Sequence, residues 1–230
     1  MTKTYLQTRD RIQVYFDQTA VKAWEALTNE TPVSAIRAKV RAGRQEMREL
    51  ILSKLPKDLK GRFVLDAGCG TGQMAVELGK RGANVLGIDI SPNLIDIAED
   101  RLPRELKSSV KFLVSDMMQD HGHFDYVILM DSLIHYPESD TVSVLRNFLE
   151  KTREGILFTL VPVNLFLRMK LILGRGFPSS DRSPVLAPVN IKPFIKMFDR
   201  DFKEKFAFEI TSIGRIDKWF YTSEAIELKR

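Results

Sequence analysis

A turn with three glycines is the feature of this sequence that most plainly suggests chemistry. A short apolar run at 63–65 leads into Asp66, and Gly68, Gly70 and Gly72 follow at alternate positions. Glycine permits a tight turn and lets a ligand approach the backbone closely. The sequence therefore predicts a binding site in which a carboxylate lies beside a turn of accessible backbone.

The spacing of the glycines separates two classes of ligand. Dinucleotide sites use Gly-x-Gly-x-x-Gly and place the pyrophosphate at a helix N-terminus, whereas the third glycine here comes one residue earlier. Asp66 would also repel a pyrophosphate and attract a cation. S-adenosylmethionine carries a sulfonium and an ammonium, so we predict this cofactor. A nicotinamide dinucleotide is the less favoured alternative.

Two further acids follow short apolar runs that read as strands. Asp89 can accept hydrogen bonds from both ribose hydroxyls, and Asp116 can meet the adenine amine while Met117 packs against the ring. We assign Ile90 and Met130 to the same site. An acid at the end of a strand often caps a helix instead, so the prediction depends on the order of these elements along the chain.

The elements that would position these residues alternate between strands and helices. Apolar runs predict parallel strands at 63–65, 84–89, 110–114, 126–130 and 156–161. Helices are predicted between them at 73–81, 92–101 and 139–152, and Ser91 followed by Pro92 is typical of a helix start. Such alternation predicts an α/β fold with a parallel sheet covered on both faces.

The two ends of the chain depart from this alternation. Residues from about Thr8 to Leu55 have helical spacing and precede Pro56, so we predict an N-terminal helical lid at 1–56 and a main domain at 57–230. Near the other end, 206–213 and 219–228 are predicted to form a hairpin with its turn at 214–218. An insertion of apolar and basic residues at about 163–191 lies between the fifth strand and this hairpin.

The composition allows one α/β domain and disfavours several classes of protein. Of 230 residues, 44% are apolar, and the net charge is +5. The single cysteine, Cys69, excludes an internal disulfide framework. The sequence has no signal peptide and no long apolar run, so we expect a cytoplasmic protein, with a peripheral membrane contact left open. No nucleic-acid partner is expected, because no nucleic-acid-binding module is recognisable.

Beyond these patterns, the sequence resembles a known family. The glycine turn and Gly87-Ile88-Asp89-Ile90-Ser91 resemble the class I S-adenosylmethionine-dependent methyltransferases in general. Other stretches resemble the magnesium-protoporphyrin IX O-methyltransferases of bacteriochlorophyll and chlorophyll synthesis. They are 15–24, Val40-Arg41-Ala42-Gly43-Arg44, Asp131-Ser132-Leu133-Ile134-His135-Tyr136, 177–184 and 219–224. The similarity runs from about Tyr15 to Glu227 and is greatest with the bacteriochlorophyll branch.

The resemblance implies a fold and a reaction. The fold is Rossmann-like, with a mostly parallel seven-stranded sheet, an antiparallel C-terminal hairpin, an N-terminal helical lid and an insertion after the fifth strand. The reaction is methyl transfer from S-adenosylmethionine to a propionate carboxylate of magnesium protoporphyrin IX, which gives the monomethyl ester and S-adenosylhomocysteine. A magnesium chelatase large subunit is an implied partner.

This reaction calls for positioning groups. A propionate is already ionised at neutral pH, because its pKa resembles that of Glu, about 4.3. His135, which follows the fourth predicted strand, is the first catalytic candidate, and Tyr15 in the lid is the second. The residues assigned to the substrate are Arg41, Arg44, Arg182 and Tyr136. The insertion at about 163–191 is expected to bind the porphyrin, and a membrane contact through it is the alternative.

Two alternatives remain at this stage. One is an S-adenosylmethionine-dependent methyltransferase with another small acceptor, for example a quinone precursor. The other is a cofactor-binding regulator that has lost catalysis. We expect no protein-bound metal, because the magnesium belongs to the substrate.

Overall fold

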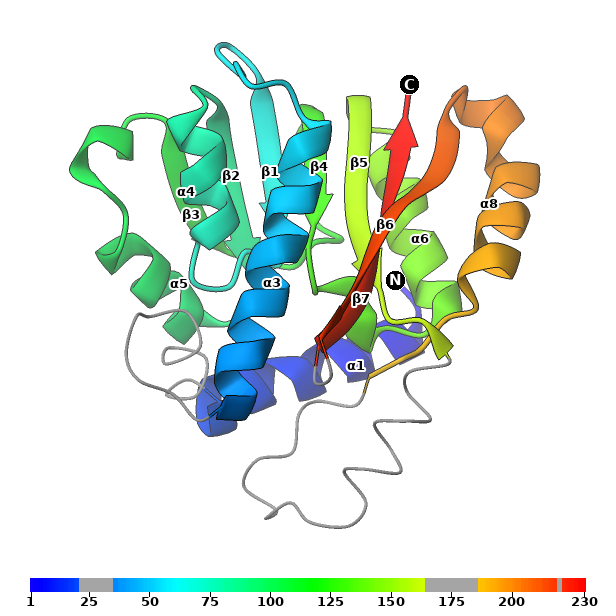
Figure 1. Cartoon of the computed structure of the whole chain (residues 1–230), viewed down its shortest axis with the longest axis horizontal. Coiled ribbons are helices and arrows are strands. Elements are labelled where there is room, and N and C mark those ends of the chain that lie inside the picture. Colours follow the sequence, from blue (N-terminus) through cyan, green and yellow to red (C-terminus); the bar gives the residue numbers. More distant parts are fainter. Residues whose placement is uncertain (21–34, 164–185, 219–220) are drawn as a thin grey trace.

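A seven-stranded sheet lies between layers of helices in the computed structural model, which describes residues 1–20, 35–163, 186–218 and 221–230 (Figure 1). The strands are β1 (Phe63–Ala67), β2 (Asn84–Asp89), β3 (Val110–Val114), β4 (Phe124–Leu129), β5 (Thr152–Leu160), β6 (Glu209–Lys218) and β7 (Tyr221–Lys229). The α-helices are α1 (Lys3–Val14), α3 (Ala35–Lys54), α4 (Gln73–Lys80), α5 (Pro92–Asp100), α6 (Glu138–Leu149) and α8 (Ile191–Phe206). Short π- or 3₁₀-helical segments are η1 (Tyr15–Ala20), η2 (Arg104–Leu106) and η3 (Leu133–His135).

The strand order is β3-β2-β1-β4-β5-β7-β6. Strands β1 to β5 are parallel, and β7 runs antiparallel to both β5 and β6. The predicted fold, a mostly parallel sheet with an antiparallel C-terminal hairpin, is confirmed. Strands β2 and β3 lie on one side of β1, whereas β4 and β5 lie on its other side, so the direction of strand addition reverses at β1. Such a switch point opens a crevice at the carboxyl ends of the strands.

Alternate residues of the strands face two separate hydrophobic layers. Val64 of β1 packs with residues of α3 and α4, whereas its neighbour Leu65 packs with residues of α6 and α8. Met47 and Ile51 of α3 are completely buried. Helix α3 therefore packs against one face of the sheet, although its residues belong to the segment 1–56 that was predicted to form a lid.

Helix α1 lies across the carboxyl ends of the strands (Figure 1). It begins earlier than the expected Thr8, because the side chain of Thr2 accepts a hydrogen bond from the backbone N–H of Tyr5 at 3.0 Å and caps the helix. Tyr5 and Ile12 are buried in the layer that contains α6 and α8. The helix is thus anchored at the edge of the sheet where the crevice opens.

Local sequence signals predicted some ends of helices and strands correctly and others wrongly. Ser91 caps α5 and Pro92 begins it, as predicted. The predicted turn at 214–218 is wrong, because β6 continues through Gly214 to Lys218 with a shift of register beside that glycine. A glycine inside a strand can mark a bulge as well as a turn. Helix α8, whose Phe194 and Phe198 are buried, was not predicted.

No helix in the described part of the chain combines the length and the apolar character that crossing a bilayer requires.

Candidate active site

The glycine turn after β1 brings the backbone to the edge of a pocket. Gly68, Gly70 and Gly72 have φ values of +80°, +54° and +78°, which residues with a side chain rarely adopt. A Cβ added to Gly68 would lie 2.4 Å from Cβ of Ser132, whereas one added to Gly70 would meet nothing within 4 Å. The turn therefore packs tightly on the loop after β4 at Gly68 and is open at Gly70.

Asp89, the last residue of β2, accepts two hydrogen bonds from the backbone beside the pocket. Its Oδ2 accepts from the N–H of Gly70 at 2.9 Å, and its Oδ1 accepts from the N–H of Ser91 at 3.0 Å. Burial raises the pKa of this carboxyl, although the hydrogen bonds oppose the effect. A carboxylate offers about four acceptor sites, so Asp89 can still accept hydrogen bonds from a ligand.

Asp66 is a buried acid behind the same turn. Its side chain is 2% exposed, and among the described residues no donor lies within hydrogen-bond distance of its Oδ2. Burial raises the pKa of Asp66 to about 7; the charge on Asp89 adds to this, and the backbone N–H of Ala75 and the Arg48 guanidinium oppose it. A buried carboxylate with an unmatched oxygen is suited to a cationic group.

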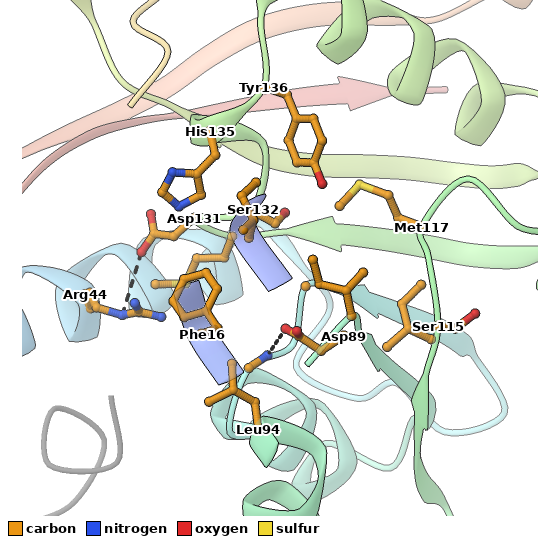
Figure 2. A pocket seen from close by; sticks show the side chains of 16 residues that line it. Phe16, Arg44, Asp89, Leu94, Ser115, Met117, Asp131, Ser132, His135 and Tyr136 are labelled. Atoms are coloured by element: carbon orange, nitrogen blue, oxygen red, sulfur yellow. Dashed lines mark hydrogen bonds and ion pairs between the residues drawn. The ribbon is translucent and has the colours of Figure 1, made fainter. Parts of the chain in front are cut away.

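A pocket joins the turn to the loop after β4 and, with the open solvent at its mouth included, encloses about 620 Å³. Figure 2 shows two groups of side chains on its walls. The glycine-turn side includes Asp89, Leu94, Ser115 and Met117, together with Gly70, which is hydrogen-bonded to Asp89. The arginine side includes Arg44, Asp131, Ser132 and His135.

His135 is fixed by packing on the arginine side. It ends the short helix η3 and is 6% exposed. Its ring packs edge-on against Phe16, with the ring centroids 6.3 Å apart. The next residue, Tyr136, also lines the pocket and stacks on Tyr5, with a centroid distance of 5.0 Å. Helix α1 and segment η1 thus reach the pocket through aromatic contacts.

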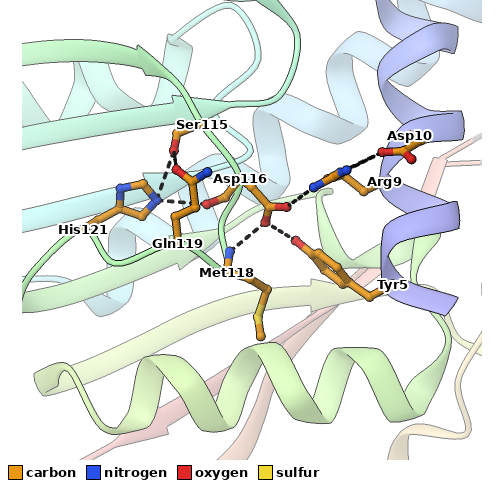
Figure 3. A network of polar contacts seen from close by, with 8 residues as sticks. All are labelled: Tyr5, Arg9, Asp10, Ser115, Asp116, Met118, Gln119 and His121. Atoms are coloured by element: carbon orange, nitrogen blue, oxygen red, sulfur yellow. Dashed lines mark hydrogen bonds and ion pairs between the residues drawn. The ribbon is translucent and has the colours of Figure 1, made fainter. Parts of the chain in front are cut away.

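Asp116 faces helix α1 rather than the pocket (Figure 3). Its Oδ1 accepts hydrogen bonds from the Tyr5 hydroxyl at 2.5 Å and the Met118 N–H at 2.8 Å, and its Oδ2 pairs with Arg9 at 2.9 Å. Residues 115 and 117 line the pocket, but Asp116 does not. In this structure its carboxylate anchors α1 beside the site.

The structure brings most of the predicted site residues together. Those that line the pocket are Gly68, Gly70, Asp89, Ile90, Met117, Met130, Arg44, His135 and Tyr136. Those that lie outside its lining are Tyr15, Asp66, Gly72, Asp116 and Arg41. Gly72 has a packing role, because an added Cβ would lie 2.6 Å from the Phe112 ring. Arg182 lies outside the described residues.

Several residues that line the pocket are absent from the sequence-based predictions. Asp131 and Ser132 directly follow β4, at the edge where ligands of parallel sheets bind, so their position was a usable signal. Ser115 likewise follows β3. Ile12 and Phe16 had no such signal, because the sequence does not show which face of an N-terminal helix meets the pocket.

Within residues 1–20, 35–163, 186–218 and 221–230, no group of three or more His, Cys, Asp or Glu side chains is arranged to hold a metal ion.

Two family profiles match the sequence. Residues 129–230 match a profile described as "Magnesium-protoporphyrin IX methyltransferase C-terminus". Residues 64–155 match a profile described as "Methyltransferase domain". The second contains the glycine-turn side of the pocket, and the first contains most of the arginine side.

Full-length relatives agree with these profiles. The chain is 45% identical over its whole length to the whole of a magnesium-protoporphyrin O-methyltransferase from Rhodobacter capsulatus. Its fold matches a crystal structure of magnesium protoporphyrin IX methyltransferase from Synechocystis PCC 6803 with bound SAH, with a TM-score of 0.81 and 26% identity over 95% of this chain and 98% of that one. By contrast, a ubiquinone biosynthesis O-methyltransferase from Coxiella burnetii matches at 36% identity over only 35% of each chain.

Proposed function

We propose how this site works from one premise: the chain belongs to the family of magnesium-protoporphyrin O-methyltransferases. It transfers a methyl group from S-adenosylmethionine to a propionate carboxylate of magnesium protoporphyrin IX. The products are the monomethyl ester and S-adenosylhomocysteine. The observation that carries this conclusion is the 45% identity over the full length of both chains. The quinone alternative loses its support, because the similarity to a quinone-pathway enzyme covers only 35% of the chain.

The glycine-turn side has the chemistry that the cofactor needs. Oδ2 of Asp66 lacks a partner among the described residues and suits a positive charge, while Asp89 has acceptor sites for a ribose diol. Gly70 is open to the pocket, and Ile90, Met117 and Met130 provide apolar surface for the adenine and the sulfonium. When bound there, S-adenosylmethionine supplies an electrophilic methyl group. Asp116 remains a proposed adenine contact, although its carboxylate already binds three donors in this structure.

The residues on the arginine side have to orient the acceptor. A propionate is ionised at neutral pH, so no group has to remove a proton from it. The protein must place one carboxylate oxygen about 3–3.5 Å from the methyl carbon and in line with the bond that breaks. It must also exclude water without binding the nucleophile so strongly that it ceases to react.

His135 and Arg44 are the polar side chains best placed for that task. His135 lines the pocket and its ring packs against Phe16, so we assign its ring N–H to orienting the reacting carboxylate. Arg44 is the only arginine or lysine among the described residues that line the pocket. A guanidinium can bind a carboxylate through two parallel hydrogen bonds. We therefore assign Arg44 to a propionate of the substrate.

Other assignments are supported less directly. Tyr136 lines the pocket and can contact the porphyrin plane. Tyr15 lies outside the pocket lining, and its ring packs edge-on against Phe16 with the ring centroids 5.2 Å apart. A catalytic role for Tyr15 therefore requires segment η1 to move so that its side chain reaches the pocket. Arg41 also lies outside the lining, and Arg182 stays a prediction. Ile12 and Phe16 line the pocket, which supports the proposal that the N-terminal segment serves as a lid.

The proposed reaction has a direct test. The purified protein is incubated with S-adenosylmethionine and magnesium protoporphyrin IX, and the monomethyl ester is measured by mass spectrometry together with S-adenosylhomocysteine. The dimethyl ester of the same porphyrin is the matched control, because it has no free propionate. We expect the product only from the free acid. Equal cofactor turnover with the dimethyl ester would contradict propionate methylation.

Two proposals about the surroundings of the enzyme are separate from the reaction. We propose a cytoplasmic enzyme that receives its substrate from a magnesium chelatase large subunit, as the resemblance implies. A faster rate of methylation with chelatase-bound porphyrin than with free porphyrin would support the transfer, and equal rates would contradict it.

A peripheral membrane contact through the insertion at 163–191 is the second proposal, and it falls largely on residues outside the described ranges. Its test is liposome flotation of the full chain against a variant without the insertion.

A further inference from the structure

Asp131 has a backbone conformation that residues with side chains rarely adopt. Its φ is +57°, and the only other non-glycine residue with a positive φ in the described part of the chain is Ala207. Ala207 follows the last turn of α8, where a left-handed residue is common. Asp131 instead lies just after β4 on the pocket wall. Strain of this kind persists only where the surrounding structure holds it in place.

Three elements hold Asp131. From β5, Thr159 accepts a hydrogen bond from the Asp131 backbone N–H through its Oγ1 at 2.8 Å. From β7, the Tyr221 hydroxyl donates to the Asp131 carboxylate, at 3.0 Å from Oδ1 and 3.2 Å from Oδ2. From α3, Nε of Arg44 lies 3.7 Å from Oδ2 (Figure 2). The Asp131 carboxylate therefore links the arginine on the pocket wall to the interior of the sheet.

Tyr221 is a dependable donor in this arrangement. It is 9% exposed, and burial raises the pKa of its hydroxyl well above the usual value, an effect to which the charge on Asp131 adds. The hydroxyl consequently keeps its proton at physiological pH and can donate it to Asp131. This geometry favours a fixed carboxylate over one that rotates between alternative partners.

Gly43 allows Arg44 to reach this carboxylate. A Cβ added to Gly43 would lie 2.5 Å from Cδ1 of the Tyr221 ring, so the backbone of α3 packs directly against that ring. Arg44 is the next residue along the helix. The lack of a side chain at Gly43 thus sets the distance between α3 and β7, and with it the position of the guanidinium over the pocket.

The assembly unites segments that are far apart in the sequence. Gly43 and Arg44, Asp131, and Tyr221 come from three of the stretches on which the family resemblance depends. We propose that Asp131 and Tyr221 are positioning residues: Tyr221 holds the Asp131 carboxylate, and Asp131 holds the Arg44 guanidinium where it binds a carboxylate of the substrate. This inference depends on the proposed function for the assignment of Arg44.

Geometry explains why an arginine needs such a support. The guanidinium is planar and has five N–H donors in a fixed fork, so its orientation decides whether a carboxylate meets two donors or one. Electrostatic attraction to a carboxylate that lies 3.7 Å from Nε favours one orientation of the fork. An arginine on a long side chain without such a partner would lose more conformational entropy when the substrate binds. Positioning by Asp131 should therefore affect the KM for the porphyrin more than kcat.

A double-mutant cycle separates positioning from general structural support. The variants are Tyr221→Phe, Arg44→Lys and the two combined, with KM and kcat measured for magnesium protoporphyrin IX and Kd measured for S-adenosylmethionine. We expect each single variant to raise KM about ten-fold. The double variant should be no worse than Arg44→Lys alone, because Tyr221 acts through Arg44. Multiplied effects, an unchanged KM in Tyr221→Phe, or a lowered affinity for the cofactor would overturn the proposal.

Two further variants keep the test decisive. Asp131→Asn removes the charge but keeps a residue that tolerates the left-handed conformation, and it should raise KM as Tyr221→Phe does. It replaces Tyr221→Phe in the cycle if that variant fails to fold. Tyr126→Phe is the matched control, since it removes a hydroxyl that donates to Glu154 in the same sheet, outside the pocket lining. Its KM should equal that of the wild type.

The outcomes also distinguish this inference from the proposed function. A wild-type protein that forms no ester would refute the function itself. A wild-type protein that forms the ester, with unchanged KM in both Asp131→Asn and Tyr221→Phe, would refute only the positioning roles.

Discussion

Asp66→Asn should change two properties of the protein in opposite directions. The unbound protein should become more stable, and its affinity for S-adenosylmethionine should fall. Both expectations come from one observation: Asp66 is buried with a pKa of about 7 and with one oxygen unmatched among the described residues. A carboxylate in such a place destabilises the empty site and favours the cation that fills it.

The effect on stability follows from the two pKa values. Well below pH 3.8 the Asp66 carboxyl is protonated in both the folded and the unfolded chain and contributes nothing. As the pH rises toward 7 the unfolded chain ionises first, because its pKa is near the usual 3.8, and stability is lost. At about 1.4 kcal/mol for each pH unit of difference, the loss above pH 7 approaches about 4 kcal/mol.

Asparagine avoids the ionisation but not the burial of a polar group. Its amide remains incompletely hydrogen-bonded, so we expect Asp66→Asn to recover only about 2 kcal/mol at pH 8. For a chain of this size that corresponds to a rise in Tm of about 4–8 °C. At pH 4 the gain should vanish. Thermal unfolding of the unbound protein at the two pH values measures both quantities.

Binding of the cofactor should show the opposite dependence on pH. A bound cation stabilises the ionised carboxylate, so the wild type has to lose a proton from Asp66 when S-adenosylmethionine binds below pH 7. With a free pKa of about 7, the affinity at pH 7.5 should be about eight-fold higher than at pH 6. Titration calorimetry in buffers of different ionisation enthalpy measures both the affinity and the proton released. Asp66→Asn should bind more weakly and without this pH dependence.

Asp125→Asn provides the contrasting control. Asp125 is also buried, but it accepts a hydrogen bond from the Phe63 N–H and lies near Arg62 and Arg153. Its replacement should destabilise the protein at pH 8 and leave the cofactor affinity unchanged. The reasoning about Asp66 is refuted if Asp66→Asn is less stable than the wild type at pH 8, or if it binds S-adenosylmethionine with the wild-type pH dependence.

Three other predictions concern catalysis, the N-terminal helix and the glycine turn. His135→Ala should lower kcat about a hundred-fold with little change in the calorimetric affinity for S-adenosylmethionine, because it removes a group that orients the acceptor; an unchanged kcat would leave the residue a packing role only. Tyr5→Phe should lower the free energy of unfolding by about 1.5–3 kcal/mol in urea titrations, since it removes the hydroxyl that donates to the Asp116 carboxylate. Gly72→Ala should destabilise by about 2–4 kcal/mol, because a positive φ is combined with an added Cβ 2.6 Å from an aromatic ring. Gly122→Ala, with a positive φ but nothing within 4 Å, should cost only about 1 kcal/mol in the same assay.

The parallel part of the fold was predictable because its signals are local. Each strand from β1 to β4 is a short apolar run that ends at or just before a glycine or an acid, and the Ser91-Pro92 helix start has its own chemistry. Strand β5 begins four residues before its predicted start at 156, because its first residues, from Thr152 on, are polar and give no apolar signal. The hairpin was placed correctly in the chain, but its turn was not. Gly214 looked like a turn residue, and only pairing with β7 shows that β6 continues past it.

The glycine-turn side of the pocket was predictable for the same reason. Its residues follow strands that are close in sequence, so motif and position coincide. The arginine side depends on packing between α3, β4 and β7. No local sequence pattern predicts that the Tyr221 hydroxyl donates a hydrogen bond to the Asp131 carboxylate. The stretches 40–44 and 219–224 are recognisable in the sequence through a resemblance to a family. That they contact each other is visible only in the folded structure. Asp116 illustrates the converse: its place at a strand end was correct, whereas its carboxylate turns toward Tyr5 and Arg9.

The spread of the arginine side along the chain has a consequence for its synthesis. Ribosomes produce Arg44 and Asp131 well before Tyr221, while the residues of the glycine-turn side, from Gly70 to Met117, emerge together. Contacts between distant segments form late, since a long loop must close first. We expect the cofactor half of the enzyme to assemble on a nascent chain that is not yet able to orient a porphyrin. Acceptor recognition would then be the last property acquired during folding.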